Sequence, residues 1–314
     1  MDLKNIHYLF AIEEHGSVSA AAQKLYLSQP TLSQFLKKYE DYLGAPIFAR
    51  KKNGLFLTRE GDIFLKTARN ILQMEQDMKS RLAGMSETIT GEITFALSAQ
   101  RSLTLLPCVL PEFQQRYPFV SVHIVEKRTK ELEYELLKGA IDLAILIPPL
   151  VNRDIFYEVF MQEEVVLAVP KSMDFQTPIH YTAGKMPWID TADLKTLADY
   201  PFLLYDSNNR LHDFINHLFT RYEWHPKQTI TFRNLMLTVR LTAAGMGITF
   251  IPETFADPAY ELDYYSIGED GCFRPLALAY PRTGFQPDSV KRFAEMLKDS
   301  LRKQQADFQA GTKV

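Results

Sequence analysis

Residues 17–48 constrain the fold of this chain most, because they combine two short helical stretches with a tight polar turn. In the second stretch, Leu32, Leu36, Tyr39 and Leu43 recur with helical spacing and form one apolar stripe. The opposite face carries hydrogen-bond donors and little apolar area. This pattern predicts a helix-turn-helix whose second helix buries one face and exposes the other.

The exposed end of that second helix suits contact with a nucleic acid. Ser28 is a candidate N-cap, and Pro30 fits a first helical turn whose amide groups lack partners. Free N–H groups and small polar side chains at a helix start can lie against a phosphate backbone, with the side chains in a major groove. The alternative for this pattern is a three-helix interaction module.

A hairpin is expected directly after the second helix. The segment FARKKNGLFLT contains Asn53 and Gly54, which suit a type I′ turn. Arg50, Lys51 and Lys52 cluster in its arm, as a wing that follows a phosphate strand requires, although lysines at a hairpin also discourage edge pairing. Beside the polar helix we favour DNA. The predicted DNA-binding residues are Ser28, Gln29, Pro30, Thr31, Ser33, Gln34, Lys37, Arg50, Lys51 and Lys52.

The charge distribution agrees with this placement. The chain has a net charge of -3, but residues 1–60 hold eight Lys and Arg against six Asp and Glu, a balance of +2. The remaining residues hold 27 against 32, a balance of -5. The mild positive balance therefore lies where DNA contact is predicted.

At this point the chain resembles a known family. SVSAAAQKL, LSQPTLSQFLKKYE, LGAPIFAR and LTREG follow one another as in the DNA-binding region of LysR-type transcriptional regulators. A strand at 92–98, LPEFQQRYP, LLKGAIDLAIL and AAGMGITFIP resemble the effector-binding half of the same family. Phe35 and Tyr39 depart from the usual smaller or aliphatic residues, which affects packing more than base contacts. The resemblance implies a homo-oligomer that presents two N-terminal domains to two half-sites of one DNA duplex, an operator with inverted-repeat character.

Length and composition predict two or three compact units, since 314 residues with 46% apolar content can form more than one core. No apolar run is long enough to span a bilayer and the chain starts directly with a helix, so we expect a cytoplasmic protein. Cys108 and Cys272 lie far apart without metal-ligand spacing. They are predicted to be buried thiols, with a redox-sensing pair as the alternative.

Residues 59–88 are predicted to form one long helix without proline. A near-heptad apolar seam, interrupted by Glu75, favours pairing with a second helix over a surface helix that lies on its own domain. The seam consists of Phe64, Ala68, Ile71, Met78 and Leu82. We therefore expect three parts: a winged helix-turn-helix domain at 1–58, a linker and dimerisation helix at 59–90, and an effector-binding domain at 91–314.

The third part alternates short apolar strands with helices. ITFALS, VSVHIVE and DLAILI are predicted strands of βαβ units with a parallel sheet. VVLAVP, FLLYD, TITF and GITFIP form a second set, followed by YELDYYSI, PLALAYP and a terminal helix at 288–304. The predicted fold class is α/β with an all-α N-terminal part, and its two lobes, at about 91–163 with 267–304 and about 164–266, resemble periplasmic binding proteins. Ligands of such folds lie between the lobes at the carboxyl ends of strands.

The residues at those strand ends form the predicted effector site. Arg101 lies beside a helix start, where a cation is unfavourable unless it pairs with an anion. That anion could be a bound ligand, or a carboxylate such as Glu126 or Asp206. Ser102 has an ordinary N-cap as its alternative role, and Asn208 a turn. Ile147 ends the third strand, and the resemblance implies the other positions. The predicted effector-binding residues are Ser98, Gln100, Arg101, Ser102, Thr129, Ile147, Ser207, Asn208 and Thr249. They predict a small organic anion.

Catalytic motifs are missing from the sequence. His212 and His217 do not share a helix face, and Gly245-Met246-Gly247 lacks the third glycine of a dinucleotide fingerprint. We therefore expect no enzyme, no cofactor and no metal. Two alternatives stay open: a small-molecule binding protein whose N-terminal module serves assembly only, and a DNA-architectural protein without an effector.

Overall fold

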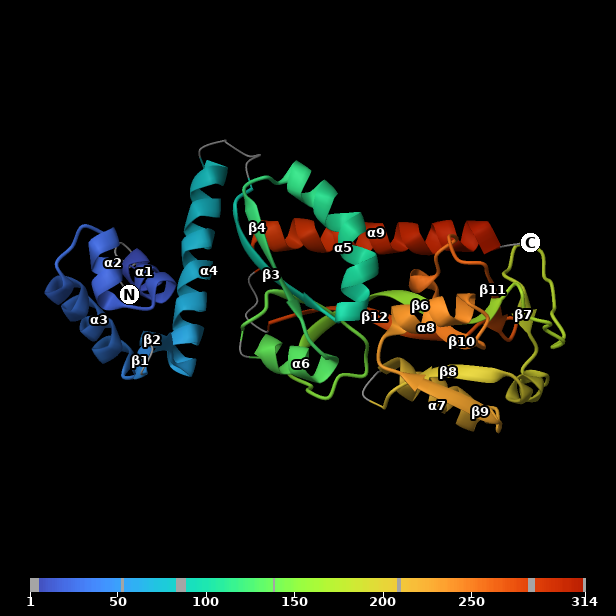
Figure 1. The fold of residues 1–314 in the computed structure, drawn as a ribbon. Helices are drawn as coiled ribbons and strands as arrows, with labels where there is room; N and C mark the ends of the chain where they lie inside the picture. The colour runs from blue at the N-terminus through green and yellow to red at the C-terminus, as the bar shows by residue number, and fades with distance from the viewer. Residues whose placement is uncertain are drawn as a thin grey trace.

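A computed structural model describes residues 6–51, 54–82, 89–137, 139–207, 210–281 and 286–312. The chain forms a small helical N-terminal unit, a long helix and a larger two-lobed α/β domain, in that order (Figure 1). The long helix α4 (Arg59–Leu82) stands between the other two parts (Figure 1).

The N-terminal unit contains the predicted helix-turn-helix. It consists of α1 (His7–His15), α2 (Val18–Lys24), α3 (Gln29–Leu43) and the hairpin β1 (Phe48–Lys51) and β2 (Gly54–Leu57). The side chains of Ser17 and Ser28 cap α2 and α3 by accepting hydrogen bonds from the Ala20 and Thr31 amides, which confirms the predicted N-cap of α3. Leu32 and Tyr39 are buried in the unit's own core, as the apolar stripe predicts.

The start of α4 is fixed to the hairpin by a close backbone approach. The Thr58 hydroxyl accepts a hydrogen bond from the Gly61 amide at 2.9 Å, and a Cβ on Gly61 would lie 2.0 Å from the Ile47 carbonyl oxygen. Only glycine fits there. The predicted turn at Asn53–Gly54 needs one correction, because Gly54 pairs with Lys51 as a residue of β2. Lys52 and Asn53 lie outside the described residues.

The first half of α4 belongs to the N-terminal core. Phe64 and Ala68 are buried there with Leu65, against α1 and α3. The pairing with a second helix that was predicted for these two residues was therefore wrong, because both pack in the core of their own chain. Core packing and helix pairing require the same apolar periodicity. Met78 is 52% exposed. The side chain of Leu82 lies outside the described residues.

Lobe I is built on three parallel strands. β3 (Gly91–Leu97) pairs with β4 (Val120–Glu126) and with β5 (Leu143–Leu146), and the crossovers are α5 (Ala99–Arg116) and α6 (Thr129–Leu137). This confirms the predicted βαβ units. The core on one face of the sheet includes Phe293, whose ring centroid lies 5.0 Å from that of Phe95 and 4.7 Å from that of Phe113.

A single long strand joins the two lobes. β6 (Phe156–Pro170) pairs with β12 (Phe273–Tyr280) up to Glu164 and with β10 (Thr249–Pro252) from Val165 onward. All these pairings are antiparallel. The sequence predicted only residues 165–170 as strand, because residues 156–164 mix polar with apolar residues without regular alternation. Residues 156–159 are all exposed.

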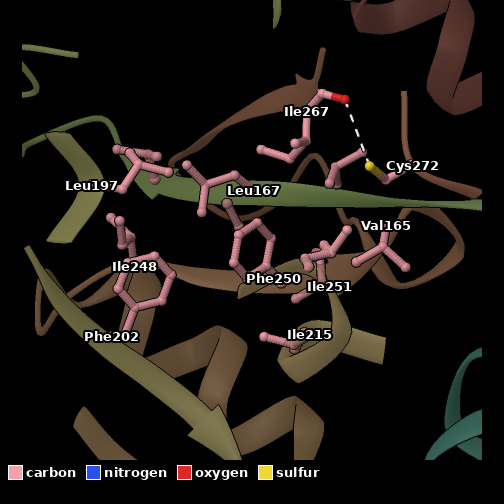
Figure 2. Close-up of a cluster of buried hydrophobic side chains, with 14 of the residues drawn as sticks. Val165, Leu167, Leu197, Phe202, Ile215, Ile248, Phe250, Ile251, Ile267 and Cys272 are labelled. Atoms are coloured by element: carbon pink, nitrogen blue, oxygen red, sulfur yellow. Dashed lines mark hydrogen bonds between the residues drawn. The ribbon is translucent and has the colours of Figure 1, made fainter. Parts of the chain in front are cut away.

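Lobe II contains the second set of elements. β7 (Trp188–Ile189), β8 (Pro201–Tyr205), β9 (Gln228–Phe232) and β11 (Leu262–Ile267) are its other strands, and α7 (Arg210–Arg221), α8 (Leu235–Ala243) and the short 3-10 helices η2 (Leu194–Asp199) and η3 (Glu253–Phe255) complete it. Its core gathers Phe202 and Phe250 around β6 (Figure 2). Cys272 lies at the edge of this core, and its thiol donates to the Ile267 carbonyl at 3.7 Å (Figure 2).

The terminal helix α9 (Asp288–Thr312) runs along both lobes (Figure 1). Its first half buries Phe293 and Leu297 in lobe I, while Phe308 packs against the lobe II core. The helix is longer than the predicted 288–304 because its last turns gain contacts with the second lobe. Cys108 on α5 is exposed, so its predicted burial was wrong, whereas the burial predicted for Cys272 is confirmed.

Candidate DNA-binding surface and interlobe site

The first turns of α3 form a solvent-exposed polar surface. Gln29, Pro30, Thr31 and Gln34 are exposed, and Ser33 is half-buried at their edge. The Ser28 hydroxyl is held by the Thr31 hydroxyl at 2.7 Å. Because the apolar face of α3 is buried, this surface is available to a partner along the length of the helix.

Basic and aromatic side chains flank this surface. Lys37 and Arg50 are exposed on α3 and β1, Lys51 is placed by its backbone only, and Lys52 lies outside the described residues. Tyr26, in the turn between α2 and α3, is 97% exposed at a positive φ of 56°. Tyr26 was not among the residues predicted from the sequence. The available signal was a large aromatic residue in the short turn between two predicted helices.

Several helices begin where strands of the two lobes end. In lobe I, α5 follows β3 and α6 follows β4, whereas in lobe II α7 follows β8 and α8 follows β9. The Ser98 hydroxyl caps α5 by accepting the Arg101 amide at 3.3 Å. Helix starts carry partial positive charge and unpaired N–H groups, so their approach from both lobes creates an electropositive region.

Hydrogen bonds connect the lobes at this place. The Gln100 amide of lobe I donates to the Arg233 carbonyl of lobe II at 2.8 Å. From the other side, the Arg210 guanidinium of lobe II donates to the Pro149 carbonyl of lobe I at 2.9 Å. Gln100, one of the predicted effector residues, is thus part of the interlobe contact. Arg210 and Arg233 also take part in this contact, but they were not identified from the sequence.

Arg101 has a different role from the predicted one. It is 4% exposed, and its Nη2 atom donates to both carboxylate oxygens of Glu163, at 2.9 and 3.0 Å. Its Nη1 atom donates to the Thr254 hydroxyl at 3.3 Å. The anionic partner of Arg101 is therefore the carboxylate of Glu163 on β6. It is not an effector, and it is neither of the carboxylates named from the sequence, Glu126 and Asp206. Arg101 is a structural residue between the lobes.

Arg274 completes a buried ionic cluster with Arg101 and Glu163. Its Nε and Nη2 atoms donate to Glu163 Oε2 at 3.0 and 2.7 Å. Burial by itself would raise the pKa of Glu163, but the two guanidinium groups outweigh it and lower that pKa to about 2. Glutamate is rarely fully buried unless it is paired, and nothing in the sequence pattern indicated the partners of Glu163.

The adjacent carboxylate, Glu164, has the opposite environment. Burial raises its pKa to about 7, Ser266 gives it one hydrogen bond, and its Oε1 atom has no partner among the described residues. Glu253 lies beside it and accepts the Glu164 amide at 2.8 Å. Burial also raises the pKa of Glu253. The strand that joins the lobes therefore carries two neighbouring carboxylates with very different proton affinities.

The other predicted effector residues differ in their hydrogen bonds and in their exposure. The Ser102 hydroxyl is buried between Glu126 and the Ala99 carbonyl, and the Thr249 hydroxyl donates to the Leu203 carbonyl at 2.6 Å. Both hydroxyls are therefore engaged in the fold. Thr129 and Ile147 are half-buried at their strand ends and Ser207 is exposed, whereas Asn208 lies outside the described residues.

Both parts of the chain match family models. Residues 3–62 match the bacterial regulatory helix-turn-helix proteins of the lysR family, and residues 86–302 match the LysR substrate binding domain. A helix-turn-helix unit joined to a two-lobed binding domain defines a ligand-responsive DNA-binding regulator. The chain belongs to the LysR family of transcriptional regulators.

Individual relatives agree over nearly the whole length. YcgK of Bacillus subtilis, an uncharacterized HTH-type transcriptional regulator, is 27% identical over 315 residues, which cover 96% of this chain and 95% of YcgK. The structure of an OxyR mutant of Corynebacterium glutamicum matches with a TM-score of 0.66 and 25% identity, covering 99% and 95% of the two chains. CbnR, solved with its target DNA, matches with a TM-score of 0.53 and 24% identity over 96% of this chain and 100% of CbnR, which shows a shared fold.

Within the described ranges, His, Cys, Asp and Glu side chains form no group of three that would hold a metal ion. Among the same residues, no helix is both long and apolar enough to cross a bilayer.

Proposed function

We propose that this regulator binds a DNA operator through α3 and its hairpin and that a small organic anion, bound between the lobes of the effector domain, controls this binding. The observation that carries the effector site is the pair of hydrogen bonds across the lobes, from Gln100 to the Arg233 carbonyl and from Arg210 to the Pro149 carbonyl. A ligand that entered here would replace both contacts and change the angle between the lobes.

The preference for an anion rests on the helix starts and on arginines other than Arg101. Arg210 and Arg233 lie beside the starts of α7 and α8, and Arg128 is exposed just ahead of α6. Asp206, 3.5 Å from Arg233, and Glu133, 3.9 Å from Arg210, balance part of this charge. Arginines and free helix amides together favour a carboxylate.

We propose the boundaries 1–58, 59–90 and 91–314 for the three parts, a homodimer or homotetramer held in part by the second half of α4, and an operator of inverted repeats. The exposed Met78 and the half-buried Ile71 support pairing of α4 with a second copy. A regulator of bacterial DNA works in the cytoplasm, and we assign it no catalytic activity.

Calorimetry with small mono- and dicarboxylates tests the effector site. The variant Arg210→Gln removes a charge-assisted hydrogen bond and should weaken the bound carboxylate by about 1.5–3 kcal/mol, roughly ten- to a hundredfold in Kd. Arg221→Gln, at the other end of the same helix, is the matched control and should bind like the wild type. Equal affinities of wild type and Arg210→Gln, or binding of neutral compounds only, would refute an anion at this place.

A further inference from the structure

Tyr26 ends helix α2 in a backbone conformation that glycine normally adopts. The Leu27 amide donates to the Ala22 carbonyl at 2.9 Å. The Tyr26 amide donates to the Gln23 carbonyl at 3.3 Å, and these two hydrogen bonds together form a Schellman motif. The motif holds Tyr26 at a φ of 56°, in the left-handed region. A bulky residue is strained there, because its Cβ atom lies too close to the following carbonyl oxygen.

The other two helices of the same unit end with glycine in this conformation. Gly16 follows α1 at a φ of 59°, and Gly44 follows α3 at a φ of 68°. Glycine adopts left-handed angles without a steric cost, which makes it the residue expected at all three helix ends. The geometry of the turn therefore does not explain why a tyrosine ends α2.

The side chain of Tyr26 does not belong to the core of the unit. It is 97% exposed, and its hydroxyl forms no hydrogen bond with the residues that the structure describes. By contrast, the rings of Tyr8 and Tyr39 pack against Phe35, with centroid distances of 5.0 and 4.9 Å. Strained backbone conformations cluster at functional sites, which favours a role of Tyr26 in binding over a role in folding.

The turn that carries Tyr26 connects two helices that take different positions on DNA. In a helix-turn-helix, the second helix enters the major groove with its first residues, while the first helix crosses the phosphate backbone. Tyr26 lies between Lys24, at the end of α2, and Gln29, at the start of α3, and all three side chains are exposed. Its place is therefore the border between the groove and a phosphate strand. Tyrosine side chains donate hydrogen bonds to phosphate oxygens, and such contacts hold a protein in position without reading bases.

We propose that Tyr26 is a DNA-contact residue whose hydroxyl donates a hydrogen bond to a backbone phosphate beside the groove that α3 enters. The inference rests on the proposed DNA binding and adds a neutral contact to the basic ones of the hairpin. The left-handed backbone sets the direction in which the ring leaves the turn. Because the hydroxyl carries no charge, its contact with the phosphate releases no counterion. Tyr26 therefore adds affinity for any DNA sequence without adding to the salt dependence of binding.

Fluorescence anisotropy on the full chain tests the contact, with a duplex from upstream of the chain's own gene and a scrambled duplex. Tyr26→Phe should bind both duplexes about tenfold more weakly than the wild type, because a hydrogen bond to a charged group is lost. The slope of affinity against salt concentration should stay unchanged. Tyr42→Phe, near the far end of α3 and 66% exposed, is the matched control and should bind like the wild type.

A second variant, Tyr26→Gly, separates binding from folding. Glycine relieves the strain of the left-handed conformation, so this variant should melt at the temperature of the wild type or above it. It should nevertheless bind both duplexes at least tenfold more weakly, because the ring and its hydroxyl are gone. Thermal melting and anisotropy on the same preparation measure the two effects.

Three results would overturn the role of Tyr26 alone. Tyr26→Phe could bind both duplexes as tightly as the wild type, or it could weaken the upstream duplex only, which would indicate base reading. Tyr26→Gly could melt below the wild type, which would show that the tyrosine serves folding. A wild type that bound neither duplex is a distinct result, since it would refute the proposed DNA binding and this contact with it.

Discussion

Glu163 is the residue on which the connection between the lobes depends most. It is fully buried and binds Arg101 from α5 and Arg274 from β12, so three segments far apart in the sequence meet at one carboxylate. Removing one partner of such a cluster leaves the other charges buried without compensation. The cluster thus specifies one arrangement of the lobes, at the cost of desolvating three charges.

Replacement of Glu163 by Gln should destabilise the effector domain by about 3–5 kcal/mol, because two guanidinium groups then stay buried without an anion. Urea denaturation measures this, with the exposed pair residue Glu269 as the control: Glu269→Gln should change stability by less than about 0.5 kcal/mol. A Glu163→Gln protein as stable as the wild type would show that the cluster contributes nothing to folding.

Glu164 should make stability depend on pH in the neutral range. Its pKa is raised to about 7 from an ordinary value of 4.5. Its stabilising contribution is therefore complete below about pH 4.5 and is lost as the pH rises through about 7. Glu164→Gln mimics the protonated form and should be more stable than wild type above pH 7, by about 2–3 kcal/mol. Parallel pH profiles of the two melting temperatures would contradict this.

At the scale of elements, the sequence identified most helices and strands but assigned some of them the wrong partners. The strands at 93–97 and 249–252 were predictable because a short apolar run between turns is typical of a buried strand. The dual use of α4 was not, since the spacing of Phe64 and Ala68 fits a partner helix as well as the chain's own core. The first half of β6 and the Arg101–Glu163 pair required the three-dimensional packing, which brings together residues 62 positions apart.

The two halves of α4 should respond differently to substitution. Phe64→Ala should destabilise the N-terminal unit by about 3–5 kcal/mol, because it opens a cavity in a buried core. Met78→Asp should leave the stability of that unit nearly unchanged but dissociate paired helices, since a charge would face the partner's apolar seam. Sedimentation and thermal melting separate the two effects. Met78→Asp with an unchanged molecular mass would exclude the second half of α4 from the dimer.

At the scale of the whole molecule, the long helix α4 connects the DNA-binding unit with the effector domain. Lys66 of α4 and Asp142 of lobe I face a cavity of about 580 Å³ between these parts, where burial lowers the pKa of Lys66 and raises that of Asp142. The two parts therefore lie beside each other, on either side of this cavity. A change in lobe angle has a direct physical route to the N-terminal unit, in addition to any change in the arrangement of subunits.

In the proposed function, α3 selects a DNA sequence while the flanking basic residues bind the DNA backbone. Fluorescence anisotropy tests it most directly, with a duplex from upstream of the chain's own gene, a scrambled duplex and a series of salt concentrations. Gln34→Ala should cost about 1–3 kcal/mol on the upstream duplex only, and Arg50→Ala should weaken both duplexes alike and lower the salt slope by about one. If the wild type bound both duplexes equally, or if Gln34→Ala weakened both alike, α3 would not be the element that selects the sequence.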